Sequence, residues 1–60
     1  MDTIPVTFLA DRVVEKLIPA GMIPSVGDIV KIEHAQYTVA AVMWDFDQPF
    51  GKATITLDLL

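Results

Sequence analysis

The stretch Gln36–Phe46, QYTVAAVMWDF, decides how this chain folds. Its large apolar residues recur at every second position, which is the pattern of a β-strand with one buried face. The alternation changes parity partway, because Tyr37 and Val39 occupy odd positions whereas Val42 and Trp44 occupy even ones. One extra residue at the change, a β-bulge, would bring both sets to the same face. We therefore predict a long strand that bends at a bulge, as strands do when a small sheet closes on itself.

The stretches on either side of it also have the length and pattern of strands. Residues 53–60, ATITLDLL, alternate between a face predicted to be buried (Ala53, Ile55, Leu57 and Leu59) and a polar face of threonine and aspartate. Residues 27–39, GDIVKIEHAQYTV, predict a hairpin with its turn near Glu33 to Gln36. No Asn-Gly or Asp-Gly pair marks its tip, so the turn type stays open.

The first third of the chain fits two templates. Residues 4–10, IPVTFLA, alternate as a strand does. Residues 11–18, DRVVEKLI, could form a short helix that begins at Asp11 and ends before Pro19. They could instead form the returning strand of a hairpin that turns at residues 10–12. We favour the strand, because two helical turns are short for a helix and two Val with one Ile suit a sheet.

These stretches add up to about five strands in 60 residues. The predicted fold is all-β: one domain over residues 1–60, either a small SH3-like barrel or a strongly bent antiparallel sheet. A domain of this size buries only about 60% of the surface of its unfolded chain, so its stability is limited. The chain has no Cys to form disulfides and one His, His34, so neither a disulfide nor a Cys/His zinc site can support it.

Composition narrows the classes of function. Eight acidic against four basic residues give a net charge of −4, which argues against nucleic-acid binding and against an anionic membrane surface. The N-terminus lacks the basic start and long apolar region of a signal peptide, and no apolar run is long enough to span a membrane. We expect a soluble, cytoplasmic protein. Because 53% of the residues are hydrophobic, we also expect apolar surface left over for association.

A resemblance supports this fold. The stretches PSVGDIVKI and QYTVAAVMWDF, followed by an amphipathic final strand, resemble the SH3-like small β-barrels. They look most like the very short barrels found among phage and prophage proteins of unknown role. The resemblance covers about the last three fifths of the chain, while Asp11-Arg12 lacks the Gly of a tight hairpin. It implies a binding module in which the Gly27-Asp28 turn leads into a strand, with no catalytic residues to carry over.

The end of the long strand holds the first candidate site residues. We expect Trp44 and Phe46 to anchor the core. Asp45 and Asp47 share the opposite face, where we interpret them as solvated strand-end charges, or as a negative patch that faces a partner. Met43 is the apolar member of that polar face, and Met is common at adaptable binding surfaces. We therefore predict a sheet-edge or dimer contact at Met43.

The remaining candidates lie in predicted loops. Met22, Ile23 and Phe50 either fold back as a lid over one end of the barrel, which we favour, or stay exposed as a binding patch. His34 is interpreted as a solvated turn residue, since no nucleophile pattern accompanies it. We identify no catalytic set, metal site or cofactor-binding motif.

Three functions are consistent with these patterns, and none of them is enzymatic. The first is a non-catalytic protein-binding module, a phage-type inhibitor or adaptor that acts on a host protein through an apolar patch or a sheet edge and that self-associates into a homo-oligomer. The second is an acidic decoy that occupies a nucleic-acid-binding protein. The third is a small structural subunit of a larger assembly. Direct nucleic-acid binding has only four bases to support it.

Overall fold

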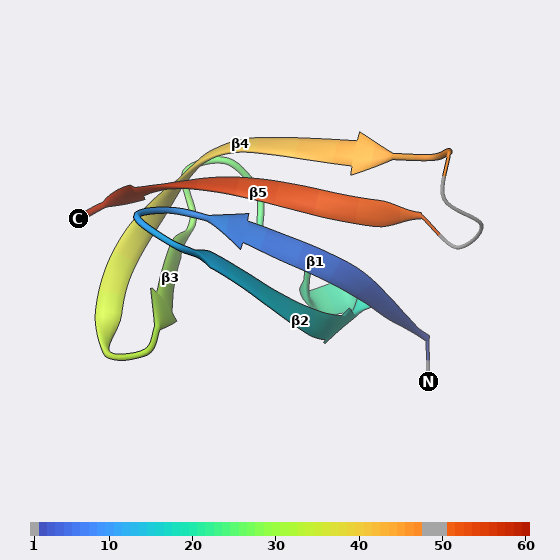
Figure 1. The fold of residues 1–60 in the computed structure, drawn as a ribbon, viewed down its shortest axis with the longest axis horizontal. Coiled ribbons are helices and arrows are strands. Elements are labelled where there is room, and N and C mark those ends of the chain that lie inside the picture. The colour runs from blue at the N-terminus through green and yellow to red at the C-terminus, as the bar shows by residue number, and fades with distance from the viewer. Residues whose placement is uncertain (1, 48–50) are drawn as a thin grey trace.

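The computed structural model describes residues 2–47 and 51–60 of the chain. In order, its elements are β1 (Thr3–Leu9), β2 (Val13–Pro19), the 3₁₀ turn η1 (Ala20–Met22), β3 (Ile29–Ile32), β4 (Ala35–Asp45) and β5 (Lys52–Leu59). The strands form one sheet in the order β2-β1-β5-β4-β3. Figure 1 shows this sheet curled into a half-barrel, so the all-β prediction is confirmed. Within the described residues no helix has the length and apolar character needed to cross a membrane.

The ambiguous segment after Asp11 is a strand, as favoured above. β1 and β2 are antiparallel, with Leu9 opposite Val13, so the chain reverses through the three residues 10–12. At the base of the hairpin the Ala20 N–H donates a hydrogen bond to the Asp2 carbonyl at 3.2 Å. β-branched side chains at three of the seven β2 positions favour the pleated conformation over a two-turn helix.

The sheet departs from a purely antiparallel arrangement at one pair. β1 and β5 run parallel, with Val6 opposite Ala53 and Phe8 opposite Ile55, whereas the other three pairs are antiparallel. A parallel neighbour requires the chain to cross from one edge to the other between the two strands. Here η1 and the segment up to Asp28 connect β2 at one edge to β3 at the other, and the chain then returns through β4 so that the final strand fills the centre of the sheet.

The predicted bulge is present in β4. Val39 lies opposite Leu57 and Ala41 lies opposite Thr56, so Ala40 is the extra residue. After the bulge Val42 faces Ile55, on the same side of the sheet as Val39. Figure 1 shows β4 bending sharply in its first half, which carries β3 over the concave face. The bulge thus keeps the apolar side chains inward while the strand turns.

The core lies on the concave face and is formed by three strands. Its buried apolar residues are Val6, Phe8, Tyr37, Val39, Ala53, Ile55 and Leu57. Ile23 folds back and packs against this cluster from the segment after η1, as predicted for a lid. Leu59 was expected to be buried with the rest of its strand face and is not: it is 73% exposed, at a position of β5 beyond Thr56, where the pairing with β1 ends.

The convex face carries a polar seam across its centre. Thr7 on β1 is buried although it faces outward, and its hydroxyl donates a hydrogen bond to the Glu15 carboxylate at 3.2 Å. From β5, the Lys52 ammonium reaches the same carboxylate at 3.6 Å. Glu15 on β2 and Lys52 on β5 therefore cover β1 from both sides. The seam explains how a threonine becomes buried without losing its hydrogen bond.

Candidate functional site

The candidate site is the outer edge of β4 beyond its bulge. The first part of β4 pairs with β3 on this side, and the pairing continues to Val39, whose N–H and carbonyl bond to Asp28 and Gly27 at 2.9 and 3.0 Å. From Ala41 to Asp45, β4 is paired only with β5 within the described part of the chain. Because an edge strand directs alternate N–H and C=O groups away from its one partner, this side presents unpaired backbone groups.

This free edge follows from the lengths of two strands. β4 has 11 residues and β3 has four, so β4 extends well beyond its neighbour. The bulge at Ala40 also separates the bent half that carries β3 from the straight half that ends at Asp45. We call residues Ala41–Asp45 on this side the β4 edge. It forms the upper margin of the sheet in Figure 1.

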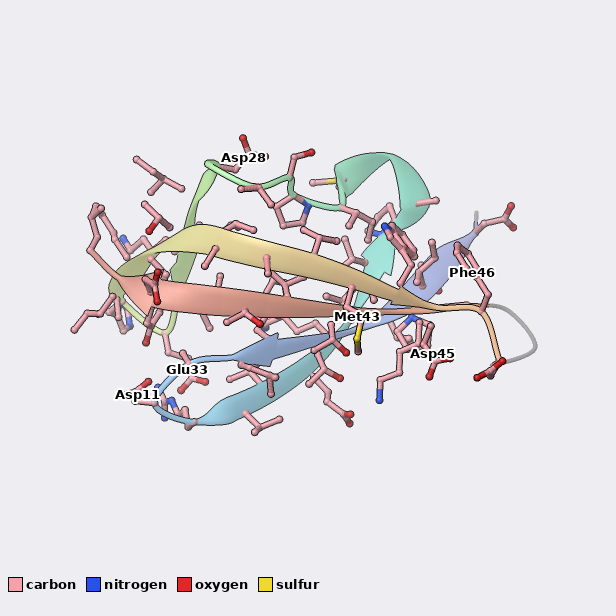
Figure 2. The ribbon with its side chains drawn as sticks, turned by 90° about the horizontal axis from the view of Figure 1, so that it is seen from above. Asp11, Asp28, Glu33, Met43, Asp45 and Phe46 are labelled. Atoms are coloured by element: carbon pink, nitrogen blue, oxygen red, sulfur yellow. The ribbon has the colours of Figure 1, made fainter. Side chains whose placement is uncertain are left out.

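Large apolar side chains flank the β4 edge on both faces of the sheet. Met43 projects from the convex face and is 60% exposed. On the other face Trp44 is 40% exposed and Phe46 is 79% exposed, and their rings stack with centroids 6.2 Å apart and planes 6° from parallel. Figure 2 shows Met43 and Phe46 projecting on opposite sides of this strand end. A strand docked here would meet apolar surface above and below its backbone.

The prediction that Trp44 and Phe46 anchor the core is wrong. Trp44 shares the concave face with its partner Ala53, as the alternation predicts. However, the pairing of β3 with β4 ends at Thr38 and does not reach this end of β4, so in the described structure Trp44 is only partly covered and Phe46 is mostly exposed. They form an exposed aromatic pair beside the β4 edge. The exposure of these rings follows from the length of β4 relative to β3, which the alternation of apolar residues does not reveal.

The two aspartates end the strand. The Asp47 N–H donates a hydrogen bond to the Asp45 carboxylate at 2.9 Å, a local turn that stops the pairing. Asp45 lies opposite Lys52 on β5, and Asp47 is exposed. No three potential metal ligands among the described residues gather into a site. The interpretation as strand-end charges fits this geometry.

Two of the free margins of the sheet, β2 and the β4 edge, differ in how well they are protected. β2, at the far margin, carries Glu15, Lys16 and Pro19 along its length. Charged residues and Pro are the usual devices by which edge strands avoid pairing with other chains. From Ala41 to Trp44 the β4 edge has neither a charge nor a Pro. The sequence therefore leaves the β4 edge open to another strand.

A second feature is the end of the half-barrel where the β1–β2 and β3–β4 hairpins come together. Here the two hairpin tips meet: Arg12 forms an ion pair with Glu33 at 2.7 Å, and the Tyr37 hydroxyl donates a hydrogen bond to Asp11 at 3.3 Å. Burial, the negative charge of Asp11 and this hydrogen bond raise the pKa of the Tyr37 hydroxyl above its ordinary value.

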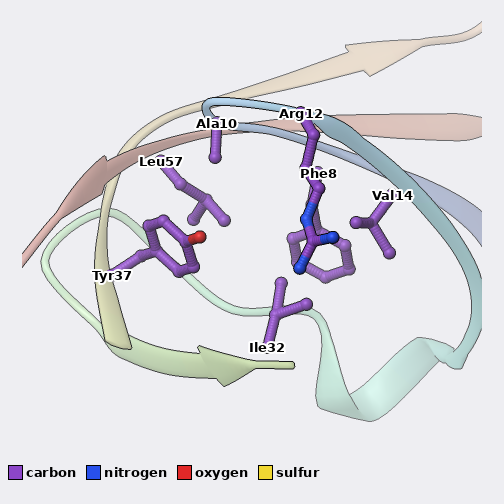
Figure 3. A pocket seen from close by; sticks show the side chains of 7 residues that line it. All are labelled: Phe8, Ala10, Arg12, Val14, Ile32, Tyr37 and Leu57. Atoms are coloured by element: carbon purple, nitrogen blue, oxygen red, sulfur yellow. The ribbon is translucent and has the colours of Figure 1, made fainter. Parts of the chain in front are cut away.

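Beneath these contacts lies a pocket, shown in Figure 3 and lined by Phe8, Ala10, Arg12, Val14, Ile32, Tyr37 and Leu57. Its free volume is about 10 Å³, which is the lower limit for one water molecule. A substrate or cofactor would not fit into this pocket, so we interpret these contacts as structural ones that close the end of the barrel.

The other predicted site residues are scattered. Met22 is 71% exposed in η1, so the prediction that it folds back as a lid is wrong, whereas Ile23 is partly buried and packs against the core. Neither residue joins the β4 edge. Phe50 lies outside the described residues. His34 is an exposed turn residue, as predicted. The structure thus brings Met43, Asp45 and Asp47 together with Trp44 and Phe46.

Comparisons with protein-family models, with curated proteins and with solved structures find no significant match to this chain. The functional interpretation therefore rests on the geometry of the molecule and on the patterns in its sequence.

Proposed function

We propose that the protein is a small non-catalytic binding module that pairs its β4 edge with an extended segment of a protein partner. One observation carries the proposal: among residues 2–47 and 51–60 nothing pairs with the outer side of Ala41–Asp45, and exposed Met43, Trp44 and Phe46 flank that side. In strand addition, main-chain hydrogen bonds supply affinity and the flanking side chains supply specificity.

The flanking side chains suit two kinds of contact. The stacked rings of Trp44 and Phe46 provide a rigid apolar platform, and such aromatic anchors dominate the energy of many interfaces. Met43, on the other face, has a flexible thioether that adapts to different partners. Together they would cover both faces of an added strand.

The resemblance to short phage barrels extends this proposal to a class of partner. We propose that the module acts as an inhibitor or adaptor on a host protein, and that the β4 edge is its contact surface. The two alternatives, an acidic decoy and a structural subunit, predict different results in the capture experiment described next. That experiment therefore distinguishes the three functions.

The test is capture from an extract of the cells that make the protein, with tagged wild type, Met43→Lys and Leu17→Lys side by side. Lysine on an edge strand opposes strand addition, so Met43→Lys should reduce the recovered partner about tenfold. Leu17→Lys is a matched control, since Leu17 is 68% exposed on the same convex face but lies on the protected edge β2.

The proposal requires that wild type and Leu17→Lys retain the same protein at high salt and that Met43→Lys lose it. A partner that all three variants retain equally would overturn the assignment of the β4 edge. A partner released from every variant by salt would instead favour the acidic decoy. Recovery of the chain alone would favour a self-contained subunit.

A further inference from the structure

We infer that the β4 edge pairs with the β4 edge of a second copy of this chain, antiparallel, about a two-fold axis at Met43. The inference rests on the proposed function, in which this edge receives an added strand, and it names a second copy as the source of that strand when no heterologous partner is bound. A two-fold dimer requires a surface that complements itself. The β4 edge meets that requirement in its backbone, its side chains and its charges.

The backbone allows one register that uses the whole edge. With Met43 opposite Met43, Val42 faces Trp44 and Ala41 faces Asp45 of the second copy, so all five residues are paired. Shifting the axis to Val42 would bring Val39 into the pairing, but Val39 is already bonded to Asp28 and Gly27. Every pair in the Met43 register joins two odd-numbered or two even-numbered residues. The N–H and C=O groups that point away from β5 in one copy therefore meet the corresponding groups of the other copy.

The side chains match in this register. On the convex face the two flexible Met43 side chains meet at the axis, where cross-strand neighbours lie about 5 Å apart. On the concave face each half-buried Val42 meets Trp44 of the other copy, which would cover part of the indole that is now exposed. An aromatic residue opposite a β-branched one is a favourable cross-strand pair.

The charges do not oppose the pairing although each copy carries −4. Each Asp45 lies opposite an alanine of the other copy. The two Asp45 residues stand four strand positions apart, about 14 Å along the sheet, which exceeds the Debye length at physiological salt. Within its own sheet Asp45 also faces Lys52. The like charges therefore sit at the two ends of the interface.

The molecule also exposes more surface than its size requires. A compact monomer of 6.6 kDa exposes about 3,900 Å². This chain exposes 4239 Å². A five-residue strand pair with one aromatic pair on each copy falls below a standard interface of about 800 Å² per partner. We therefore expect a weak, reversible dimer, with a dissociation constant of roughly 10 µM to 1 mM.

The two-fold axis gives a specific test by charge reversal. In Met43→Lys two lysines meet across the axis, and in Met43→Glu two glutamates meet, so each variant should dimerise at least about tenfold more weakly than wild type. Mixed in equal amounts, the two variants place Lys opposite Glu and should regain association. Sedimentation equilibrium measures all three samples, with circular dichroism to verify that each variant is folded.

Leu17→Lys is again the matched control and should dimerise as wild type does. It changes the net charge in the same way as Met43→Lys, from −4 to −3, so any general charge effect appears in both variants. Loss of the dimer only in Met43→Lys and Met43→Glu, with recovery in the mixture, would establish the two-fold axis at Met43.

Two outcomes would overturn the inference. Wild type that stays monomeric at about 1 mM shows that a second copy is not the occupant. A mixture of the two variants that stays as monomeric as each alone places the contact elsewhere. Neither outcome bears on the proposed function, which fails separately when Met43→Lys captures the same heterologous partner as wild type.

Discussion

At the scale of single residues, Ile55 has the most central position in the molecule. It is fully buried on the middle strand, beside Phe8 on one side and Val42 on the other. A chain of 60 residues has a stability of only about 3 to 9 kcal/mol, so one core side chain is a large fraction of the total.

We predict that Ile55→Val lowers the free energy of unfolding by about 0.5 to 1.5 kcal/mol and that Ile55→Ala lowers it by about 2 to 5 kcal/mol, enough to unfold much of the population. Urea denaturation followed by circular dichroism measures both. The control is Ile29→Ala on β3, where the side chain is 62% exposed and the loss should stay below about 1 kcal/mol. Equal losses at the two sites would contradict the core described above.

Tyr37 supports a second prediction, on pH. It is the only tyrosine, so tyrosinate absorbance reports this hydroxyl alone. Because burial and the Asp11 carboxylate raise its pKa, its titration midpoint should lie above the ordinary value of about 10. The fold favours the neutral form, so this contribution to stability is present below the pKa of the unfolded chain. It is lost as the pH rises through the pKa of the folded chain.

The Tyr37 shift has an isosteric control. Asp11→Asn removes the negative charge but keeps an oxygen that can accept the hydrogen bond. The midpoint should then fall toward the ordinary tyrosine value and remain partly raised by burial. An unchanged midpoint in Asp11→Asn would show that the two hairpin tips do not meet in solution.

Residue positions also show what the sequence could and could not predict. Parity correctly placed Val42 and Trp44 on the concave face. It could not show whether anything covers that face, which depends on how far a neighbouring strand extends. For this reason Trp44, Phe46 and Leu59, which follow the apolar pattern, are exposed where one neighbouring strand has ended: β3 pairs with β4 only as far as Thr38, and β1 pairs with β5 only as far as Thr56.

At the scale of elements, the β3–β4 turn stores local strain. Glu33 and His34 occupy its two central positions with φ of 51° and 72°, both in the left-handed region. Hairpin turns of this kind favour Asn-Gly, because a Cβ is disfavoured there. Glu33 is tied to the barrel closure by its ion pair with Arg12, whereas among the described residues the His34 side chain forms no hydrogen bond or ion pair.

We therefore predict that His34→Gly raises the free energy of unfolding by about 0.5 to 1 kcal/mol, after the larger entropy of Gly in the unfolded chain is allowed for. His34→Ala is the control, since it removes the imidazole but keeps the Cβ, and it should give no gain. Thermal unfolding of the three proteins measures the difference. Equal stability of the Gly and Ala variants would indicate that the turn is unstrained.

The elements themselves were more predictable than their pairing. Periodicity, turn residues and the parity change identified five strands, the hairpin at residues 10–12 and a bulge between Val39 and Val42, which the structure places at Ala40. The parallel contact of β1 with β5 was not predicted. An amphipathic strand has the same alternation whichever neighbour it pairs with, so this contact depends on how the whole chain closes.

At the scale of the whole molecule, surplus apolar surface and net negative charge act in opposite directions on association. The β4 edge offers backbone groups and apolar side chains, while each copy repels the next with a charge of −4. Salt screens the charge repulsion and leaves the apolar and backbone contacts almost unchanged. The response of any complex to salt therefore shows which effect holds it together.

We predict that raising NaCl from about 0.1 M to 1 M, which shortens the Debye length from about 10 Å to 3 Å, leaves the dimer equally strong or strengthens it a few fold. Sedimentation equilibrium of wild type at the two salt concentrations measures the dissociation constant, with Leu17→Lys as the control for a change of one charge. A tenfold weakening would show that attraction between charged groups holds the copies together. That result would contradict the β4 edge as the contact, because its carboxylates face alanines of the other copy, and would favour an acidic surface that binds basic partners.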